Sequence, residues 1–157
     1  MSSECATDSL DLDQEQRAEI VKNLNEQIKK AKKTAVSMAN LSESDKNYTL
    51  ELIERELRES INYIVEANKQ DLNNPENADL NSTMKDRLML NADRIMGMAN
   101  AVRQIINMKD PVHEILDGWQ HPNGMTITKV RVPLGVIGII YEARPNVTTD
   151  AIALAIK

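Results

Sequence analysis

Apolar side chains recur every three or four residues through most of the first two-thirds of the sequence. This spacing places them on one face of a helix, so residues 13–109 predict a helical segment of four or five helices. The first helix is expected to begin near Asp13. Packing within the protein is the interpretation we favour for its apolar stripe, and a short coiled-coil contact with another chain is the alternative. The stripe consists of Ile20, Leu24, Ile28, Ala31, Ala35 and Met38.

Polar residues that accept hydrogen bonds from free backbone N–H groups mark the ends of the other predicted helices. The Ser-x-x-Asp spacing from Ser42 matches a capping box, and Asn91 is suited to cap the last helix of the segment. Ser60 marks a break, and the Asn-Asn-Pro sequence at 73–75 ends a helix. A short helix is expected at 83–88. The predicted buried face of the last helix consists of Ile95, Met98, Ala99, Val102, Ile105 and Ile106.

The pattern changes at Asp110, after which two runs have the character of strands. These runs span 112–120 and 125–132, and the dipeptide Asn123-Gly124 lies between them. Asn-Gly favours a type I′ turn, in which both central residues have a positive φ. We therefore predict a β-hairpin within residues 110–132.

The run 134–141 is apolar at both alternating sets of positions. Neither face of such a strand is suited to water, which is typical of the interior of a parallel α/β sheet. Gly135 and Gly138 lie within the run, but their spacing is not that of a dinucleotide-binding fingerprint. We interpret them as positions of close packing against a neighbouring element.

The chain becomes polar immediately after this run. Three polar side chains follow: Glu142, Arg144 and Asn146. Pro145 is expected to end the strand. Caps for an apolar helix at 151–156 are offered by Thr148, Thr149 and Asp150. Because ligands of open α/β sheets bind at the carboxyl ends of the strands, this turn is the candidate site.

Charge and composition exclude several classes of partner. The net charge of −5 arises within residues 1–19, and residues 1–12 predict a disordered acidic tail. The remainder is balanced and has no footprint for nucleic acid, and the lysine cluster at 29–33 is interpreted as a solvated helix face. No apolar run approaches the roughly 20 residues of a membrane span.

The single cysteine, Cys5, cannot form an internal disulfide, and no neighbouring base lowers its pKa. We interpret it as a bystander and expect a reducing, cytoplasmic setting. The two histidines, His113 and His121, have no further ligand at a metal-binding spacing, so no metal site is predicted.

Residues 131–150 read Arg-Val-Pro-Leu-Gly-Val-Ile-Gly-Ile-Ile-Tyr-Glu-Ala-Arg-Pro-Asn-Val-Thr-Thr-Asp. This block resembles the signature of the γ-glutamyl phosphate reductase family, also called glutamate-5-semialdehyde dehydrogenases, within the aldehyde dehydrogenase superfamily. Blocks at 41–47, 64–71, 84–88 and 102–105 follow the same order as in that family. The resemblance covers nearly all of the chain after about residue 21. Family members are more than twice this length, so the resemblance is to their N-terminal portion.

The resemblance implies a truncated α/β fold with N-terminal helices, a β-hairpin, and the first strand and helix of a Rossmann-like aldehyde dehydrogenase coenzyme domain. On this basis residues 110–132 form an arm with a possible role in oligomerisation, and residues 133–157 start the NADP-binding domain. The intact enzyme is expected to be a homo-oligomer without nucleic-acid or membrane partners.

For the intact enzyme, the resemblance implies reduction of the small molecule γ-glutamyl phosphate to glutamate 5-semialdehyde with NADPH, in proline biosynthesis. A cysteine thiolate attacks the acyl phosphate, phosphate leaves, and the cofactor reduces the resulting thioester. By the order of the family, that cysteine follows Lys157, so the chain alone is predicted to be inactive. The residues that distinguish NADPH from NADH are also absent, and this choice stays open.

The turn after the apolar run carries the residues with implied roles. The resemblance assigns cofactor contact to Tyr141, Glu142, Ala143 and Arg144. Asn146 is the candidate catalytic residue, because an asparagine in the superfamily donates its amide to the oxyanion that forms in the reaction. By count, Arg144 is the alternative equivalent, and Asn146 as the cap of a helix from Val147 is a further interpretation.

The contacts of Glu142 and Arg144 and the class of the whole chain each allow a second interpretation. Glu142 and Arg144 are expected to form a local salt bridge, with contact between Arg144 and a phosphate of substrate or cofactor as the alternative. For the whole chain, the alternative is a non-catalytic helical interaction module that binds a partner chain through the hairpin or the exposed strand.

Overall fold

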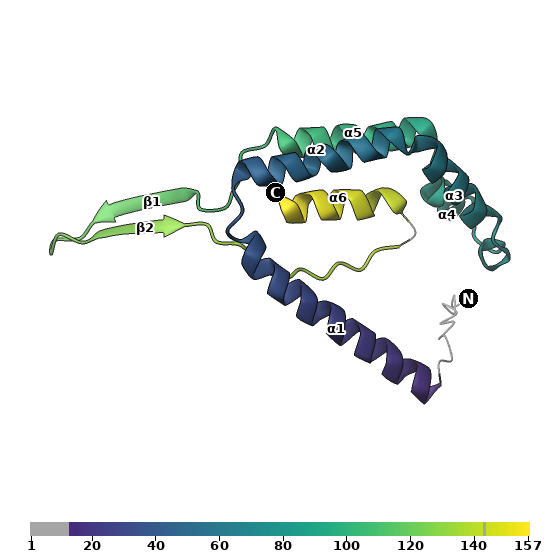
Figure 1. Cartoon of the computed structure of the whole chain (residues 1–157), viewed down its shortest axis with the longest axis horizontal. Helices are drawn as coiled ribbons and strands as arrows, with labels where there is room; N and C mark the ends of the chain where they lie inside the picture. The colour runs from purple at the N-terminus through teal and green to yellow at the C-terminus, as the bar shows by residue number, and fades with distance from the viewer. Residues whose placement is uncertain (1–12, 143) are drawn as a thin grey trace, which may run out of the picture.

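The computed structural model describes residues 13–142 and 144–157. The predicted tail at 1–12, which includes Cys5, and the candidate cofactor contact Ala143 lie outside the described residues. The described part is mostly helical, and a two-stranded antiparallel sheet projects from the helical body (Figure 1). The elements are α1 (Gln14–Met38), α2 (Glu43–Glu59), α3 (Ile61–Asn73), the 3₁₀ helix η1 (Pro75–Asn77), α4 (Ser82–Leu88), α5 (Ala92–Ile106), β1 (Ile115–Gln120), β2 (Thr126–Val130) and α6 (Pro145–Ile156).

Side-chain caps begin the helices where the sequence predicted them. Asp13 caps α1 and Ser42 caps α2, each through a complete capping box. Asn91 Oδ1 accepts a hydrogen bond from the Arg94 N–H at 2.8 Å and caps α5. The predicted break at Ser60 separates α2 from α3. Each such cap contributes about 1 kcal/mol to helix stability.

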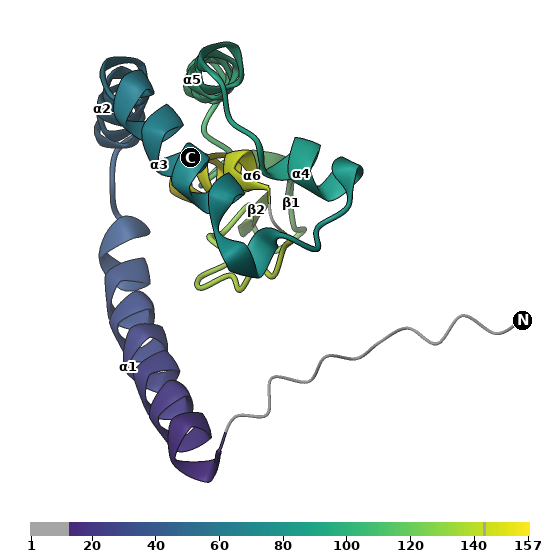
Figure 2. The same ribbon diagram turned by 90° about the vertical axis from the view of Figure 1, so that its right-hand side faces the viewer.

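The main core lies between α2, α5 and α6, which Figure 2 shows grouped together in an end-on view of α2 and α5. All six residues predicted for the buried face of α5 are buried. They include Val102, which packs in one cluster with Leu50 of α2 and Ala153 of α6. Fully burying a side chain such as Leu50 contributes about 2 kcal/mol. This core fixes α6 against α5.

A second cluster, built on Ile95, joins α3 to α5. Next to it, the buried side chain of Asn68 bridges α3 to the link between α4 and α5. Its Nδ2 donates to the Leu88 carbonyl at 2.8 Å, and its Oδ1 accepts from the Leu90 N–H at 2.6 Å. Asn68 therefore satisfies backbone groups in a link that has no helical partners for them.

Two buried lysines tie the end of α6 to the rest of the protein. Lys46 Nζ lies 2.7 Å from Asp110 Oδ2 and donates to the Lys157 carbonyl at 3.2 Å. Burial raises the pKa of Asp110, but hydrogen bonds from Lys46 and from the Val112 N–H outweigh burial and hold this pKa below its ordinary value.

The second lysine, Lys157, is also buried. Its Nζ donates to Glu43 Oε1 at 3.2 Å, to Asn47 Oδ1 at 2.8 Å and to the Ile106 carbonyl at 3.1 Å. Because these groups belong to α2 and α5, the end of α6 is held at both neighbouring helices.

Strands β1 and β2 form the predicted hairpin, but the predicted type I′ turn is wrong. Gly124 has a φ of 91° and donates its N–H to the His121 carbonyl at 2.8 Å, whereas Asn123 has no positive φ. Pro122 explains the difference, because its fixed φ near −65° suits the second position of a type I turn. The glycine that follows then adopts the positive φ typical of a bulge after such a turn.

The strand predicted at 134–141 does not form. This segment passes beneath α6 (Figure 1), and its backbone makes no hydrogen bond with the described residues. Leu134 is 88% exposed and Ile140 is fully exposed. A strand needs a neighbour that pairs with its backbone, and no strand of the described chain lies beside this segment.

The interpretation of the two glycines in this segment is also wrong. A Cβ added to Gly135 or Gly138 would meet no atom within 4 Å, so neither residue allows close packing in this structure. Gly135 has a φ of 85°, a conformation that glycine adopts without strain. Its role here is therefore conformational.

Helix α1 projects away from the helical body (Figure 1), and none of its residues is buried. Ile20, Leu24 and Ile28 are about half exposed, at 50%, 53% and 47%. The prediction that the whole apolar stripe packs within the protein is thus wrong for these three residues. None of the described helices combines the length and the apolar character needed to cross a membrane.

Candidate functional site

The candidate turn leads directly into α6, which begins at Pro145 with Arg144 as its N-cap residue. Proline suits this first position because its missing N–H is not needed there and its φ is already helical. Three predictions are therefore wrong: Pro145 begins the helix, residues 148–150 lie inside it, and Asn146 lies in its first turn rather than at its cap. The Arg144 side chain makes no capping hydrogen bond.

Glu142 pairs with Arg87 of α4, so the predicted salt bridge with Arg144 is wrong. The Arg87 Nη1 to Glu142 Oε2 distance is 3.1 Å, and both side chains are exposed, so the pair contributes about 1 kcal/mol at most. Tyr141 Oη lies 2.5 Å from Thr148 Oγ1 in α6. These two contacts attach the end of the apolar segment to α4 and α6.

An open pocket of about 430 Å³ lies beside this turn, between α6, α5 and the end of α4. Gly97 and Met98 of α5 contribute to its apolar wall. The polar lining consists of Asp86, Arg87, Arg94, Arg144, Asn146 and Asp150. Charged groups from three helices therefore converge on the candidate turn.

The arginines of the pocket differ in how they are held. Arg94 pairs with Asp86 Oδ1 at 2.8 Å, and its Nη1 donates to the carbonyls of Asp86 and Met89. The Arg144 guanidinium, in contrast, has no hydrogen bond or ion pair with any residue in the described ranges. A guanidinium is always charged and carries five donors, so Arg144 is available to an anionic ligand.

The Asn146 side chain forms one long hydrogen bond with the part of the chain that the structure describes. Its Nδ2 lies 3.4 Å from Asp150 Oδ2, one helical turn further along α6. Residues four apart share a helix face, so the amide and the carboxylate both line the pocket. Since a side-chain amide has two N–H donors, Asn146 can still donate to an oxyanion.

Sequence reasoning missed the contribution of α4 and α5 to this site. No candidate site residue was assigned to those helices from the sequence, yet Arg87, Arg94 and Gly97 line the same pocket as the predicted turn. Arg87 and Glu142 are 55 positions apart, a contact that no local pattern reveals. The only signal was the block at 84–88, which contributed to the family resemblance without an assigned role.

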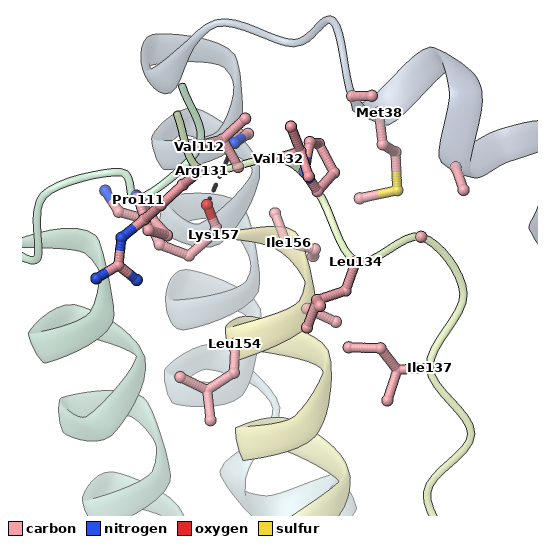
Figure 3. A pocket seen from close by; sticks show the side chains of 16 residues that line it. Met38, Pro111, Val112, Arg131, Val132, Leu134, Ile137, Leu154, Ile156 and Lys157 are labelled. Carbon is pink, nitrogen blue, oxygen red and sulfur yellow. Dashed lines mark hydrogen bonds between the residues drawn. The ribbon is translucent and has the colours of Figure 1, made fainter. Parts of the chain in front are cut away.

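A second hollow of about 390 Å³ lies between the end of α1, the segment after β2 and the end of α6. Figure 3 shows Leu134 and Ile137 pointing toward α6 there. Its two lysines, Lys46 and Lys157, are already held by the partners described above, which leaves a mainly apolar surface. Within the described ranges, no group of three or more His, Cys, Asp or Glu is placed to hold a metal ion.

Several γ-glutamyl phosphate reductases are similar to this chain, although no family model matches the sequence. The γ-glutamyl phosphate reductase of Caldicellulosiruptor saccharolyticus is 42% identical over 135 residues, which are 86% of this chain and 32% of that protein. The γ-glutamyl phosphate reductase of Campylobacter curvus is 50% identical over 129 residues, 82% of this chain and 29% of that protein. The chain spans about a third of the length of the curated relatives that it matches.

Solved structures agree with the sequence comparison. The γ-glutamyl phosphate reductase of Thermotoga maritima superposes with a TM-score of 0.81 at 39% identity, over 85% of this chain and 32% of that protein. The Saccharomyces cerevisiae enzyme of the same name superposes with a TM-score of 0.77 at 28% identity, over 82% of this chain and 33% of that protein. The mixed, mostly helical architecture with its antiparallel hairpin therefore matches that of these enzymes.

Proposed function

We propose that this chain, a homologue of the γ-glutamyl phosphate reductases over about a third of their length, forms the N-terminal portion of an oxidoreductase of that kind. The observation that carries the proposal is sequence identity of 41–50% together with a TM-score of 0.81. The intact enzyme reduces the small molecule γ-glutamyl phosphate to glutamate 5-semialdehyde, a step of proline biosynthesis. The attacking cysteine belongs to the part of that enzyme outside this sequence, so the chain alone is inactive.

In this proposal, Asn146 is the catalytic residue that the chain contributes. Its exposed amide lines the pocket, and among the described residues its one side-chain hydrogen bond is the long 3.4 Å approach to Asp150. The role is to donate a hydrogen bond to the oxygen on which negative charge develops at the acyl carbon. Loss of one such donor lowers kcat by about 10²–10³-fold.

The cofactor in this proposal is NADPH, which supplies a hydride when bound. The residues assigned to its binding are Tyr141, Glu142, Ala143 and Arg144. Two features of the described residues support a charged ligand here. Arg144 has a guanidinium without a partner, which suits a phosphate or a carboxylate, and the pair that holds Glu142 is exposed and weak enough to rearrange.

The exposed segment at 134–141 is assigned to the first strand of a Rossmann-like coenzyme domain, with α6 as the helix that follows. Support comes from its unpaired backbone and from apolar side chains as exposed as Ile140. In the intact enzyme, strands from the rest of the protein would pair with the backbone edges of this segment, and helices would cover both of its faces.

The β1–β2 hairpin is assigned to contacts between subunits of a homo-oligomer. It projects from the helical body (Figure 1) and exposes apolar side chains that a monomer has no reason to present, with Ile115 at 64% and Trp119 at 52%. The same proposal places the intact enzyme in the cytoplasm.

The test begins with the coding sequence after the codon for Lys157. The proposal expects an in-frame continuation that contains a cysteine, and the protein extended by it should reduce NADP⁺ in the presence of glutamate 5-semialdehyde and phosphate. In that protein, Asn146→Ala should lower kcat by about 10²–10³-fold. Asn62→Ala, which changes an exposed asparagine of α3, is the matched control and should leave kcat unchanged.

Three results would contradict the proposal. A stop codon directly after Lys157, together with a stable and monodisperse chain, would favour the alternative of a helical interaction module. An extended protein that is folded but inactive would refute the assigned reaction. Turnover by the 157-residue chain itself would refute the assignment of the nucleophile to another part of the enzyme.

A further inference from the structure

The pocket between α5 and α6 contains two charges of opposite sign that are not paired with each other. Two of its three arginines, Arg87 and Arg94, each form an ion pair with a carboxylate, at 3.1 Å and 2.8 Å. Arg144 and Asp150 remain, and no ion pair joins them although both line the same space. The pocket therefore offers one cation and one anion to a ligand.

A ligand in the pocket can reach both groups. Arg144 is exposed and its guanidinium has no partner among the described residues. Asp150 is partly buried, and within the described ranges its carboxylate receives only the long hydrogen bond from Asn146 at 3.4 Å. A carboxylate in this setting can accept stronger hydrogen bonds from an ammonium group than it now receives.

Gly97 gives a third and independent observation. It lies in the interior of α5, where glycine destabilises a helix relative to alanine. A Cβ at this position would meet no atom within 4 Å, so nothing in the described structure requires glycine there. Gly97 lines the pocket, and its missing side chain leaves room for a ligand to approach the helix.

From these three observations, we propose that the pocket binds the headgroup of a zwitterionic α-amino acid. Arg144 holds the α-carboxylate in a bidentate contact, Asp150 accepts the α-ammonium group, and the bare surface at Gly97 receives the α-carbon. The inference rests on the proposed function, because the γ-glutamyl group of the substrate carries such a headgroup. It replaces the assignment of Arg144 to the cofactor by an assignment to the substrate, and it leaves Tyr141, Glu142 and Ala143 to the cofactor.

The test is a titration of the ¹⁵N-labelled 157-residue chain, followed by NMR through the backbone amides of Gly97 and Asn146. Three ligands separate the two charges of the headgroup. L-glutamate has both, glutarate lacks the α-ammonium group, and 4-aminobutyrate lacks the α-carboxylate. L-glutamate should bind most tightly and should shift both amides.

Three variants test the residues of the proposed site, and a fourth is the control. Arg144→Gln should weaken both L-glutamate and glutarate on the order of tenfold, because a charge-assisted contact is lost. Asp150→Asn keeps the contact with Asn146 and should weaken L-glutamate on the order of tenfold, with glutarate unchanged. Gly97→Leu should block all three ligands while raising the melting temperature. Arg55→Gln, an equal charge change on α2 outside the pocket, should alter no affinity.

Equal affinities of the three ligands, or an Arg144→Gln variant that binds L-glutamate as the parent does, would overturn the proposal. So would the absence of any shift at Gly97 up to saturating ligand, since the pocket would then serve contact with another polypeptide. Binding of these ligands is measured without hydride transfer, so the test of the headgroup site is independent of the test of the reaction. An active extended enzyme without this binding pattern would refute only the headgroup site, whereas binding with an inactive extended enzyme would refute only the assigned reaction.

Discussion

Replacement of Lys46 by methionine is expected to lower the free energy of unfolding by about 3 kcal/mol. Lys46 is 4% exposed, and its Nζ lies 2.7 Å from Asp110 Oδ2. Methionine fills similar space but leaves the Asp110 carboxylate with the Val112 N–H as its nearest donor. Loss of one partner from a buried ion pair costs about 3–5 kcal/mol. The lower figure applies because the Asp110 side chain retains 12% exposure.

Urea denaturation followed by circular dichroism at 222 nm measures this change. With a slope of about 2 kcal/mol per molar urea, the midpoint should fall by roughly 1.5 M. Lys69→Met is the matched control, because Lys69 and Glu66 form a pair of 3.1 Å in which both side chains are more than half exposed. Its effect should be at most about 0.5 kcal/mol. Equal shifts for the two variants would refute the argument that burial decides the value of the Lys46 pair.

The same pair predicts how stability depends on pH. Because the folded state holds the pKa of Asp110 below its ordinary value, the unfolded state binds the proton more readily. The stabilisation is therefore present above the unfolded pKa of about 3.9 and is lost as pH falls through the lower folded pKa. Asp110→Asn removes this contribution, so its deficit relative to the parent should be constant above about pH 5 and should shrink as the pH falls from about 5 toward about 2. A constant deficit across this range would contradict the assignment.

Two further substitutions test other parts of the fold. Asn68→Ala removes the two hydrogen bonds that bridge α3 to the following link and leaves the Leu90 N–H buried without them, so unfolding should become easier by about 2–3 kcal/mol in the same urea assay. A loss below about 0.5 kcal/mol would show that water replaces the amide. Gly124→Ala places a Cβ at a φ of 91°, which costs about 1–2 kcal/mol within the hairpin. Limited proteolysis should then cut the hairpin faster with the helical signal unchanged, and unchanged cleavage would contradict the turn assignment.

The helices were predictable because each depends on neighbours in sequence. The apolar period of α5 gave all six of its buried residues, and Asp13, Ser42 and Asn91 mark caps through bonds that reach only three positions along the chain. The hairpin was predictable for the same reason, but its turn type was not. Pro122 constrains φ more strongly than Asn123-Gly124 favours a type I′ turn.

The segment at 134–141 and the pocket depend on distant partners. The apolar pattern of residues 134–141 shows that this segment is suited to buried surroundings. It forms a strand only when another strand supplies hydrogen bonds to its backbone. The start of α6 was misplaced because Pro145 was interpreted as the end of a strand, although proline equally suits the first turn of a helix. Arg87 and Arg94 reach the site only through the packing of α4 and α5, which no local pattern encodes.

The unpaired backbone of residues 134–141 has a practical consequence. Its amide protons have no acceptor among the described residues, so they should exchange with deuterated solvent at rates close to those of an unstructured peptide. The same amides would become protected as soon as another strand, from a longer form of the protein or from a partner, pairs with them. Hydrogen exchange at these eight positions is therefore a direct signal of whatever completes the sheet, and it needs neither substrate nor added label.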